Sequence, residues 1–455
     1  MKNGMYVQNV GKKRTIAMKL SNVGVYFPHQ YVVQKNGKTR LRPVTYYHWT
    51  ATPHKLVWSY TEGEYQKITL TRFDAGSRHK IRHWLKTMYD FEFKTYTEKL
   101  TPKVDGDELE ALGEYGADLR RYLKVVKDLS QIRGLIEATR EDSTVTSRID
   151  TNGTITGRFT SSNVNLNQIP KQPEFRSLFT APEGWTFVGV DFDQQELVNL
   201  GHYLFPYDNG QYADTVANGK KEDETDIHNV NKRMAGLDSR DAAKIFGFQF
   251  LYGAGAVKNG DSLLKELLTD YTEEEYIYAK DKVLGRSMNI NGEAYFPIGK
   301  DVYVLVDELL IHKAIYGERV MEKFTTNTPG LKELIAQLTK DSENGYITVP
   351  GGRILSIRHK HAALNTHLQG LGGQAMKVYL VTIHKLLREA GLQHGTDFIQ
   401  QATIYDEVDM IVKDEHVETV KAILEKAFPL VSFKLGLNNS YSGGAMSGKN
   451  WAVCH

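Results

Sequence analysis

The sequence predicts an α+β protein built from several lobes. Its 455 residues exceed the roughly 250–300 at which a single hydrophobic core stops growing. Residues 20–73 are rich in Tyr, Val and Thr between turns, which indicates short strands. Residues 109–136 place apolar side chains at three- and four-residue steps, which indicates a long helix. From residue 345 onward, short strands alternate with a helix expected near Ala363–Leu387.

Composition excludes several classes of protein. With 41% hydrophobic and 25% charged residues, the chain can bury large cores, which excludes disordered and collagen-like proteins. The 57 Lys and Arg nearly balance 55 Asp and Glu, which argues against a histone-like protein. Cys454 is the only cysteine, so a disulfide framework and a thiolate metal site are excluded and a reducing compartment fits. No apolar run approaches the roughly 18 residues that a membrane span needs.

The middle of the chain is predicted to alternate turns, one buried strand and helices. Residues 140–180 are polar and turn-rich, Thr186–Val190 reads as a buried strand followed by a helix, and residues 201–340 are mainly helical with acidic loops. Basic residues gather in three places, and each group is as consistent with a solvated helix face as with a phosphate contact. The groups are Lys12 to Arg14, Arg78 to Lys86, and Arg120 to Arg133.

Two acidic stretches are candidates for chemistry. Asp191 follows the predicted buried strand and Glu196 lies on the helix after it. Mg²⁺ takes oxygen ligands from rigid elements and leaves room for substrate phosphates. Asp406 and Glu407 join two apolar runs that read as a hairpin. Taken alone, such a pair is more often a surface turn, because Asp favours turns for backbone reasons.

A cationic and aromatic stripe is the third candidate. Arg240, Lys244, Phe248 and Tyr252 recur at four-residue steps, so on a helix they form one slowly winding row. Ser239 or Asp238 could cap the N-terminus of this helix, where free N–H groups favour anions. The row spans about 18 Å at 1.5 Å per residue, which suits a nucleotide. By itself it fits an amphipathic helix with an aromatic core edge better.

Two other kinds of site are excluded. Gly443 to Asn450 has the Gly and Lys spacing of a phosphate loop, but Asn450 stands where Ser or Thr should hold Mg²⁺. The chain printed here also leaves no room after it for the helix that would hold phosphate. No zinc motif occurs among the 15 histidines.

In this order, the three candidate stretches resemble motifs of family A DNA polymerases, most of all the phage replicative branch. Asp191–Glu196 resembles motif A, Arg240–Gly253 resembles motif B, and Tyr405–Glu407 resembles motif C. Thr156–Pro170 is similar to the conserved segment that precedes motif A, and Gly448–His455 is similar to phage polymerase tails. The similarity runs from about residue 70 to the end of the chain.

This resemblance implies a right-hand fold, with an antiparallel palm sheet plus helices and mostly helical fingers and thumb. The implied boundaries are a thumb at 74–145, a palm at 146–200 and 341–455, and fingers at 201–340. Residues 1–73 form a β-rich N-terminal leader outside this scheme.

The resemblance also implies roles for single residues in catalysis and nucleotide binding. Asp191, Asp406 and the Phe192 carbonyl would hold two Mg²⁺, which Mn²⁺ could replace, and Glu407 would support them. Lys244 would protonate the leaving pyrophosphate. The residues implied to bind dNTP are Arg240, Lys244 and His228 at the phosphates, Phe248 at the sugar, Gln194, and Glu196 as a steric gate bonded to Tyr252.

A further set is implied to contact primer-template DNA. These residues would read acceptors in the minor groove that all correct pairs share. They are Arg158, Asn165, Gln168, Arg353, Asn365, Gln369 and Tyr405. Tyr405 replaces the usual histidine of motif C, Asp193 replaces a common serine, and His361 stands where an arginine is expected. These departures concern primer positioning and fidelity, because none of the three is an implied metal ligand.

The implied function is DNA-templated DNA synthesis from a primer 3′-hydroxyl, releasing pyrophosphate, in phage replication within the bacterial cytoplasm. The expected partners are primer-template DNA and dNTPs, without a membrane. A separate exonuclease, helicase or processivity subunit is left open. We predict no 3′–5′ exonuclease in this chain, because the first 70 residues lack an Asp-x-Glu and room for that domain. Alternatives are a single-subunit RNA polymerase, a non-catalytic DNA-binding replication protein and a reverse transcriptase.

Overall fold

The computed structural model describes residues 74–454, apart from 98, 100, 105, 111, 291, 300, 301 and 358, and six strands before residue 74. The chain divides into two compact units, Met1–Asp128 and Leu129–His455. We describe each unit by itself. Among the described residues, no helix combines the length and the apolar character needed to cross a membrane.

The first unit holds the N-terminal strands and a small helical core. Strand β1 pairs with β6, β2 with β3 and β4 with β5, all antiparallel. Ile81 and Leu85 of α1 are fully buried together with Val104 and Leu109. The bounds are β1 Met5–Asn9, β2 Val32–Val33, β3 Thr39–Arg40, β4 Arg42–His48, β5 Lys55–Thr61, β6 Ile68–Arg72, α1 Arg78–Tyr89, β7 Thr95–Tyr96 and α2 Gly106–Glu110.

The long helix predicted over residues 109–136 is interrupted at its start. Helix α2 ends at Glu110 and α3 spans Glu114–Ala138. Gly113, between them, has φ +59°, a left-handed backbone that glycine adopts without steric cost. The periodicity therefore located the helix correctly, and the glycine marks the turn before it.

The second unit carries the remaining elements. The helices after α3 are α4 Pro173–Arg176, α5 Gln195–Asp208, α6 Gln211–Asn218, α7 Ile227–Ala235, α8 Arg240–Leu251, α9 Ala256–Leu263, α10 Glu273–Leu284, α11 Glu308–Asn327, α12 Leu331–Asp341, α13 Ala363–Glu389 and α14 Val417–Leu435. The strands are β8 Arg148–Asp150, β9 Thr160–Ser162, β10 Trp185–Asp191, β11 Met288–Ile290, β12 Glu293–Gly299, β13 Val302–Leu305, β14 Tyr346–Val349, β15 Arg353–Ser356, β16 Phe398–Ile404, β17 Glu407–Lys413 and β18 Ala445–Gly448. Short 3₁₀ turns lie at Leu166–Gln168, Ser342–Asn344, Lys360–Ala362, Asp414–His416 and Trp451–Cys454.

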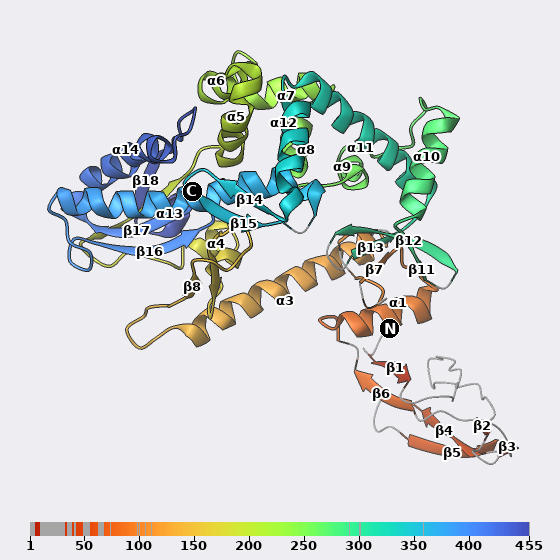
Figure 1. The fold of residues 1–455 in the computed structure, drawn as a ribbon. Helices are drawn as coiled ribbons and strands as arrows, with labels where there is room; N and C mark the ends of the chain where they lie inside the picture. Colours follow the sequence, from red (N-terminus) through yellow and green to blue (C-terminus); the bar gives the residue numbers. More distant parts are fainter. Residues whose placement is uncertain are drawn as a thin grey trace. The chain divides into compact units, whose positions relative to one another are not determined.

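A four-stranded antiparallel sheet organises this unit, in the order β16-β17-β10-β18. Alternate residues of each strand point to opposite faces. Val188, Val190 and Val408 belong to the core that the sheet shares with α13 and α14, which lie together beside the strands in Figure 1. Phe187 and Ile411 belong to a second, smaller core with Trp451.

Several predicted elements are present where the sequence placed them. The buried strand is β10, the hairpin is β16 and β17, and the predicted C-terminal helix is α13. Gly443 to Asn450 contains strand β18, which pairs with β10, in agreement with its exclusion as a phosphate loop.

Two parts of the second unit differ from expectation. The stretch predicted as mainly helical also contains β11, β12 and β13, which form consecutive antiparallel pairs. Helix α14, with Pro429 inside it, was not anticipated. A second large core joins α5, α7, α8, α11 and α12, and Phe246 and Phe324 meet there with ring centres 5.4 Å apart.

Candidate active site

Two carboxylates from distant parts of the chain meet at one end of the central sheet. Asp191 is the last residue of β10 and lies opposite Glu407 in the register with β17. Asp406 lies in the turn before β17, and its carbonyl accepts a 3.2 Å hydrogen bond from the Phe192 N–H. Burial, and then the carboxylates of Asp191 and Glu196, raise the pKa of Asp406 to about 7. The site thus concentrates negative charge.

The backbone around the two carboxylates is unusual. Tyr405, directly before Asp406, has φ +56°, and Gln194, before α5, has φ +50°. Non-glycine residues rarely adopt this left-handed region, and at functional sites the surrounding structure holds them there. Gly443 passes so close that a Cβ atom on it would lie 2.2 Å from the Asp191 carbonyl oxygen.

The donor set at this end of the sheet suits a hard cation. The Asp191 and Asp406 carboxylates lie next to the Phe192 backbone, whose carbonyl could add a third oxygen donor. Among the described residues, no group of three or more His, Cys, Asp or Glu side chains could hold a metal by itself. At phosphoryl-transfer sites Mg²⁺ is commonly bound by one or two carboxylates together with substrate and water oxygens.

Glu196 is fixed by donors from two other segments. The Tyr252 hydroxyl and Arg158 Nη2 each lie 2.6 Å from its Oε1. The hydrogen bond between Glu196 and Tyr252 is the one expected from the resemblance. Burial and the Glu196 carboxylate raise the pKa of Tyr252 to about 12, so this hydroxyl stays protonated and donates.

Helix α8 carries the predicted cationic and aromatic row. Ser239 caps it by accepting a 3.1 Å bond from the Ala242 N–H, as expected, and Tyr252 is its C-terminal cap. Arg240 donates from Nε and Nη2 to Asp226 Oδ2 at 3.0 and 2.6 Å. Lys244 is exposed.

His228 lies beside this row and is buried. Its ring centre is 6.2 Å from that of Phe248. Burial and the nearby cations Arg240 and Lys244 lower the pKa of His228, so the ring is neutral at neutral pH. The neutral His228 ring can therefore donate a hydrogen bond to an anion but carries no positive charge.

Five of the seven predicted DNA contacts line one hollow of about 490 Å³. They are Arg158, Asn165, Gln168, Gln369 and Tyr405. Asn365 lies apart and donates a 3.1 Å bond to the Tyr252 carbonyl. Arg353 also lies apart: its Nη2 donates to Asn152 Oδ1 at 2.7 Å, and its guanidinium packs against Gly157, where a Cβ atom would clash.

Some side chains that hold these groups were not expected from sequence. Arg176 and Trp451 hold Glu407, Asp226 holds Arg240, and Lys377 donates to the Gly157 carbonyl. A single sequence offers no local signal for such pairs, because the partners are up to 231 residues apart. The exception is Asp226, which lies two residues before the predicted phosphate contact His228.

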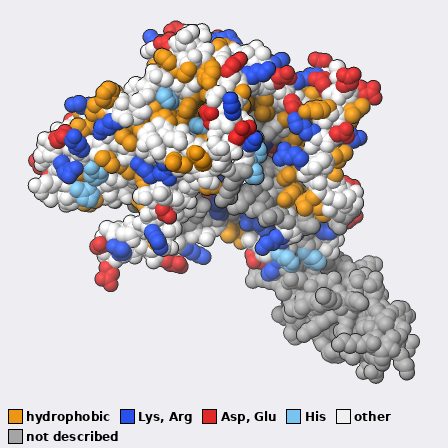
Figure 2. Space-filling view, in the orientation of Figure 1, with side chains coloured by type: hydrophobic (Ala, Val, Ile, Leu, Met, Phe, Trp, Pro, Cys, Tyr) orange, Lys and Arg blue, Asp and Glu red, His pale blue; other side chains and the backbone are white. Residues whose placement is uncertain are grey.

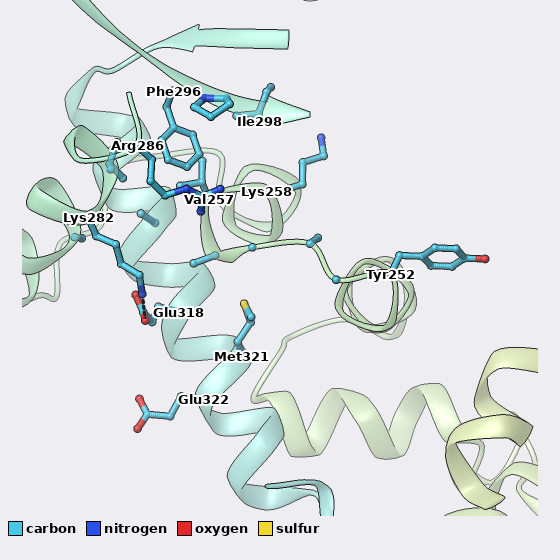
Figure 3. A pocket seen from close by; sticks show the side chains of 18 of the residues that line it. Tyr252, Val257, Lys258, Lys282, Arg286, Phe296, Ile298, Glu318, Met321 and Glu322 are labelled. Atoms are coloured by element: carbon cyan, nitrogen blue, oxygen red, sulfur yellow. Dashed lines mark hydrogen bonds and ion pairs between the residues drawn. The ribbon is translucent and has the colours of Figure 1, made fainter. Parts of the chain in front are cut away.

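A second cavity, of about 1000 Å³, lies beyond the C-terminal end of α8 (Figure 3). Small residues Gly253 to Ala256 form one wall, and Phe296 and Ile298 of β12 form another. The Lys282–Glu318 ion pair crosses one side at 2.7 Å, while the Tyr252 ring points away from the other labelled side chains. Of the predicted site residues, Tyr252 lines this cavity.

The surface carries charge of both signs. Figure 2 shows Lys and Arg dispersed among Asp and Glu on the face drawn, rather than one continuous basic area. This mixture agrees with the net charge of +2. Recognition of an anionic ligand would therefore depend on local groups such as Arg240 and Lys244.

Comparison with known proteins gives consistent matches. A sequence model of DNA polymerase family A matches residues 55–275. The DNA-directed DNA polymerases of Escherichia phage T7 and Enterobacteria phage T3 are each 28% identical over 433 residues, covering 86% of this chain and 54% of theirs. The chain therefore spans about half the length of these relatives.

A solved structure shows the same fold. The POL domain of Pol1 from M. smegmatis, in complex with DNA primer-template and dNTP, superposes with a TM-score of 0.62 at 16% identity. The match covers 84% of this chain and 62% of that chain. The fold is thus the α+β polymerase fold. The chain is similar to DNA polymerase family A over residues 55–275 and to phage DNA polymerases over most of its length.

Proposed function

We propose that the chain is a DNA-templated DNA polymerase that extends a primer 3′-hydroxyl with dNTPs and releases pyrophosphate. The observation that carries the proposal is the meeting of Asp191 and Asp406 at one end of the sheet, in a chain that also presents Arg240 and Lys244 on one helix. Carboxylates that gather cations and side chains that neutralise phosphates are the parts that nucleotidyl transfer needs.

Asp191, Asp406 and the Phe192 carbonyl would hold two Mg²⁺. Bound there, the ions would supply a lower pKa for the primer hydroxyl and charge neutralisation at the α-phosphate and the leaving group. Burial, and then the Asp191 carboxylate, raise the pKa of Asp406, and a cation bound between the two carboxylates would favour the charged form of both. Mn²⁺ could replace Mg²⁺, because it accepts the same oxygen ligands.

Side chains of α7 and α8 would bind the triphosphate. Arg240 offers a planar fork of donors, and Lys244 offers a mobile point charge. Lys244 is exposed and is our candidate for donating a proton to pyrophosphate. His228, neutral at neutral pH, would donate a hydrogen bond, and Phe248 beside it would pack on the sugar.

Glu196 would select deoxyribose. With one carboxylate oxygen held by both Tyr252 and Arg158, the side chain cannot turn away cheaply from a ribose 2′-hydroxyl. Gln194, in the left-handed turn before α5, would contact the same nucleotide. This arrangement favours a DNA polymerase over an RNA polymerase, since a ribonucleotide would have to displace a carboxylate that is held by two hydrogen bonds.

Primer-template DNA would lie along the hollow formed by Arg158, Asn165, Gln168, Gln369 and Tyr405, with Asn365 and Arg353 at further points. Amide and guanidinium donors match the acceptors that every correct pair presents in the minor groove.

Three expectations from the sequence remain predictions. They are the division into thumb, palm, fingers and leader, the absence of an exonuclease, and action in the host cytoplasm with further replication subunits.

Primer extension tests this function. The purified chain is given a 5′-labelled primer on a DNA template or an RNA template, with Mg²⁺ and either dNTPs or rNTPs. We expect extension on the DNA template with dNTPs. Extension with rNTPs would indicate an RNA polymerase, efficient copying of RNA would indicate a reverse transcriptase, and DNA binding without extension would indicate a non-catalytic replication protein.

A further inference from the structure

The Glu407 carboxylate is buried and held from two sides. Only 5% of the residue is exposed. Trp451 Nε1 donates to its Oε1 at 2.8 Å, and Arg176 Nη1 donates to the same oxygen at 3.3 Å. A carboxylate taken out of water is costly unless it is paired and hydrogen-bonded. The two donors therefore help to hold this side chain in place.

Arg176 and Trp451 also contact each other. The guanidinium carbon lies 4.2 Å from the centre of the indole ring, and both residues are less than 5% exposed. A cation over an aromatic face is attracted most strongly when both are desolvated. Arg176 Nε is buried without a hydrogen-bond partner, while Nη1 is paired with Glu407.

The segments that carry these two residues are tied together. The backbone N–H of Trp451 donates to the Phe179 carbonyl at 3.0 Å, and the backbone N–H of Ala181 donates to the Lys449 carbonyl at 3.0 Å. The Phe179 and Trp451 rings meet edge to face, 5.4 Å apart. The two segments pack in the smaller core with Phe187, and this packing sets their position relative to the sheet.

Glu407 connects these two segments to the candidate metal ligands. It follows Asp406 directly and lies opposite Asp191 in the strand register. The turn before it contains Tyr405 at φ +56°, a conformation that must be held by its surroundings. Glu407 is the first residue of β17, so holding its side chain also restrains the turn that contains Tyr405 and Asp406.

We propose that Arg176 and Trp451 are positioning residues, which hold the Glu407 carboxylate and thereby fix the turn that carries Asp406. The inference rests on the proposed polymerase function and extends it to two residues for which the resemblance implied no role. Its physical basis is that a displacement of about 1 Å at a reacting group can lower a rate by about a hundredfold.

Trp451→Phe isolates the hydrogen bond, because it removes the indole N–H and keeps an aromatic ring for Arg176. Trp185→Phe is the matched control: it makes the same change in a residue packed on the same core. Arg176→Lys, which keeps a charge but loses the planar fork, provides a second variant if Trp451→Phe folds poorly.

Single-turnover extension separates positioning from folding. The burst amplitude reports the fraction of active molecules, and the rate constant reports the site itself. We expect Trp451→Phe to lower the rate constant about tenfold, with the amplitude and the dNTP half-saturation unchanged. A lower amplitude with an unchanged rate constant, or equal rate constants for Trp451→Phe and Trp185→Phe, would overturn the proposal.

Amide hydrogen exchange gives a readout that does not depend on activity. We expect faster exchange at residues 404–408 in Trp451→Phe than in Trp185→Phe or the unaltered chain. Equal exchange in all three proteins would refute the anchor. If the unaltered chain extended no primer, the polymerase proposal would fail, and the exchange experiment would still decide whether these residues hold the turn.

Discussion

The Tyr252 hydroxyl donates to the Glu196 carboxylate at 2.6 Å, joining the end of α8 to the first turn of α5. Arg158 Nη2 contacts the same carboxylate oxygen at 2.6 Å. Glu196 is 7% exposed, so its carboxylate is both paired and shielded from water. One side chain thus links the segment before β10, the helix after it and the cationic helix.

We predict that Glu196→Ala raises ribonucleotide use. The smaller side chain leaves room for a ribose 2′-hydroxyl and removes the carboxylate that would oppose it. The ratio of rNTP to dNTP incorporation should rise about tenfold or more, since steric exclusion at a packed site is worth more than 1.4 kcal/mol. Single-turnover incorporation of one nucleotide of each kind measures this ratio.

Tyr252→Phe is the companion variant. It removes one of the two donors and leaves the carboxylate in place with Arg158, so we expect a smaller rise than in Glu196→Ala. Glu183→Ala, which alters an exposed glutamate in the turn before β10, should leave the ratio unchanged. An unchanged ratio in Glu196→Ala would refute the steric role.

Phe248→Tyr should ease acceptance of chain terminators. The half-buried ring lies beside His228, and a phenol there could replace the hydrogen bond that a missing 3′-hydroxyl would have made. We expect more frequent termination at equal ratios of ddNTP to dNTP. Phe205→Tyr, on the exposed face of α5, is the control. Equal termination by both variants would contradict the assignment of Phe248 to the sugar.

Arg240→Ala should weaken dNTP binding. The side chain is held by Asp226 with two hydrogen bonds to one carboxylate oxygen, from Nε and Nη2, which orient the guanidinium group. Losing a charge-assisted contact to phosphate is worth roughly 1.5–3 kcal/mol, so dNTP half-saturation should rise about tenfold or more. Arg233→Ala, on the exposed side of α7, serves as the control. An equal effect of both changes would show only general charge attraction.

Lys377 should make stability depend on pH above neutrality. Burial and Arg353 lower the pKa of Lys377 to about 8, below its value in the unfolded chain. Between pH 8 and the unfolded pKa, the unfolded state therefore binds more protons than the folded state, and stability rises with pH. Below pH 8 both states are protonated, and the penalty of burying the charge is fully present.

Urea unfolding of Lys377→Met and the unaltered chain at pH 7 and pH 10 checks this sign. As pH rises, the free energy of unfolding of the unaltered chain should increase relative to that of the variant. Lys385→Met, at an exposed position of the same helix, should run parallel to the unaltered chain. Parallel curves for Lys377→Met as well would contradict the lowered pKa.

Local elements could be predicted from sequence because their signals are local. The apolar run that became β10, the hairpin around Asp406 and the Ser239 cap of α8 all depend on residues close together in the chain. The strands β11 to β13 are short and irregular, with Pro297 near a register shift. Proline argues against a continuous element, so neither these strands nor α14, which contains Pro429, gave a clear pattern.

The site itself could not be assembled from spacing. Asp191 and Asp406 meet through the pairing of β10 with β17, and pairing over such a separation leaves no local pattern. The resemblance to family A polymerases supplied that link. It gave no account of Arg176, Trp451 or Lys377, whose contacts are set by tertiary packing around the motifs.

The most direct test of the central claim is single-turnover primer extension by Asp406→Ala, with Asp193→Ala as the matched control. Both substitutions remove a carboxylate near the end of β10, but Asp193 is exposed and bonded to Ser442. We predict that Asp406→Ala binds primer-template DNA with unchanged affinity and loses extension by at least about a thousandfold, while Asp193→Ala retains most of its rate. Extension by Asp406→Ala at the rate of the control would contradict the assignment of this turn as the catalytic centre.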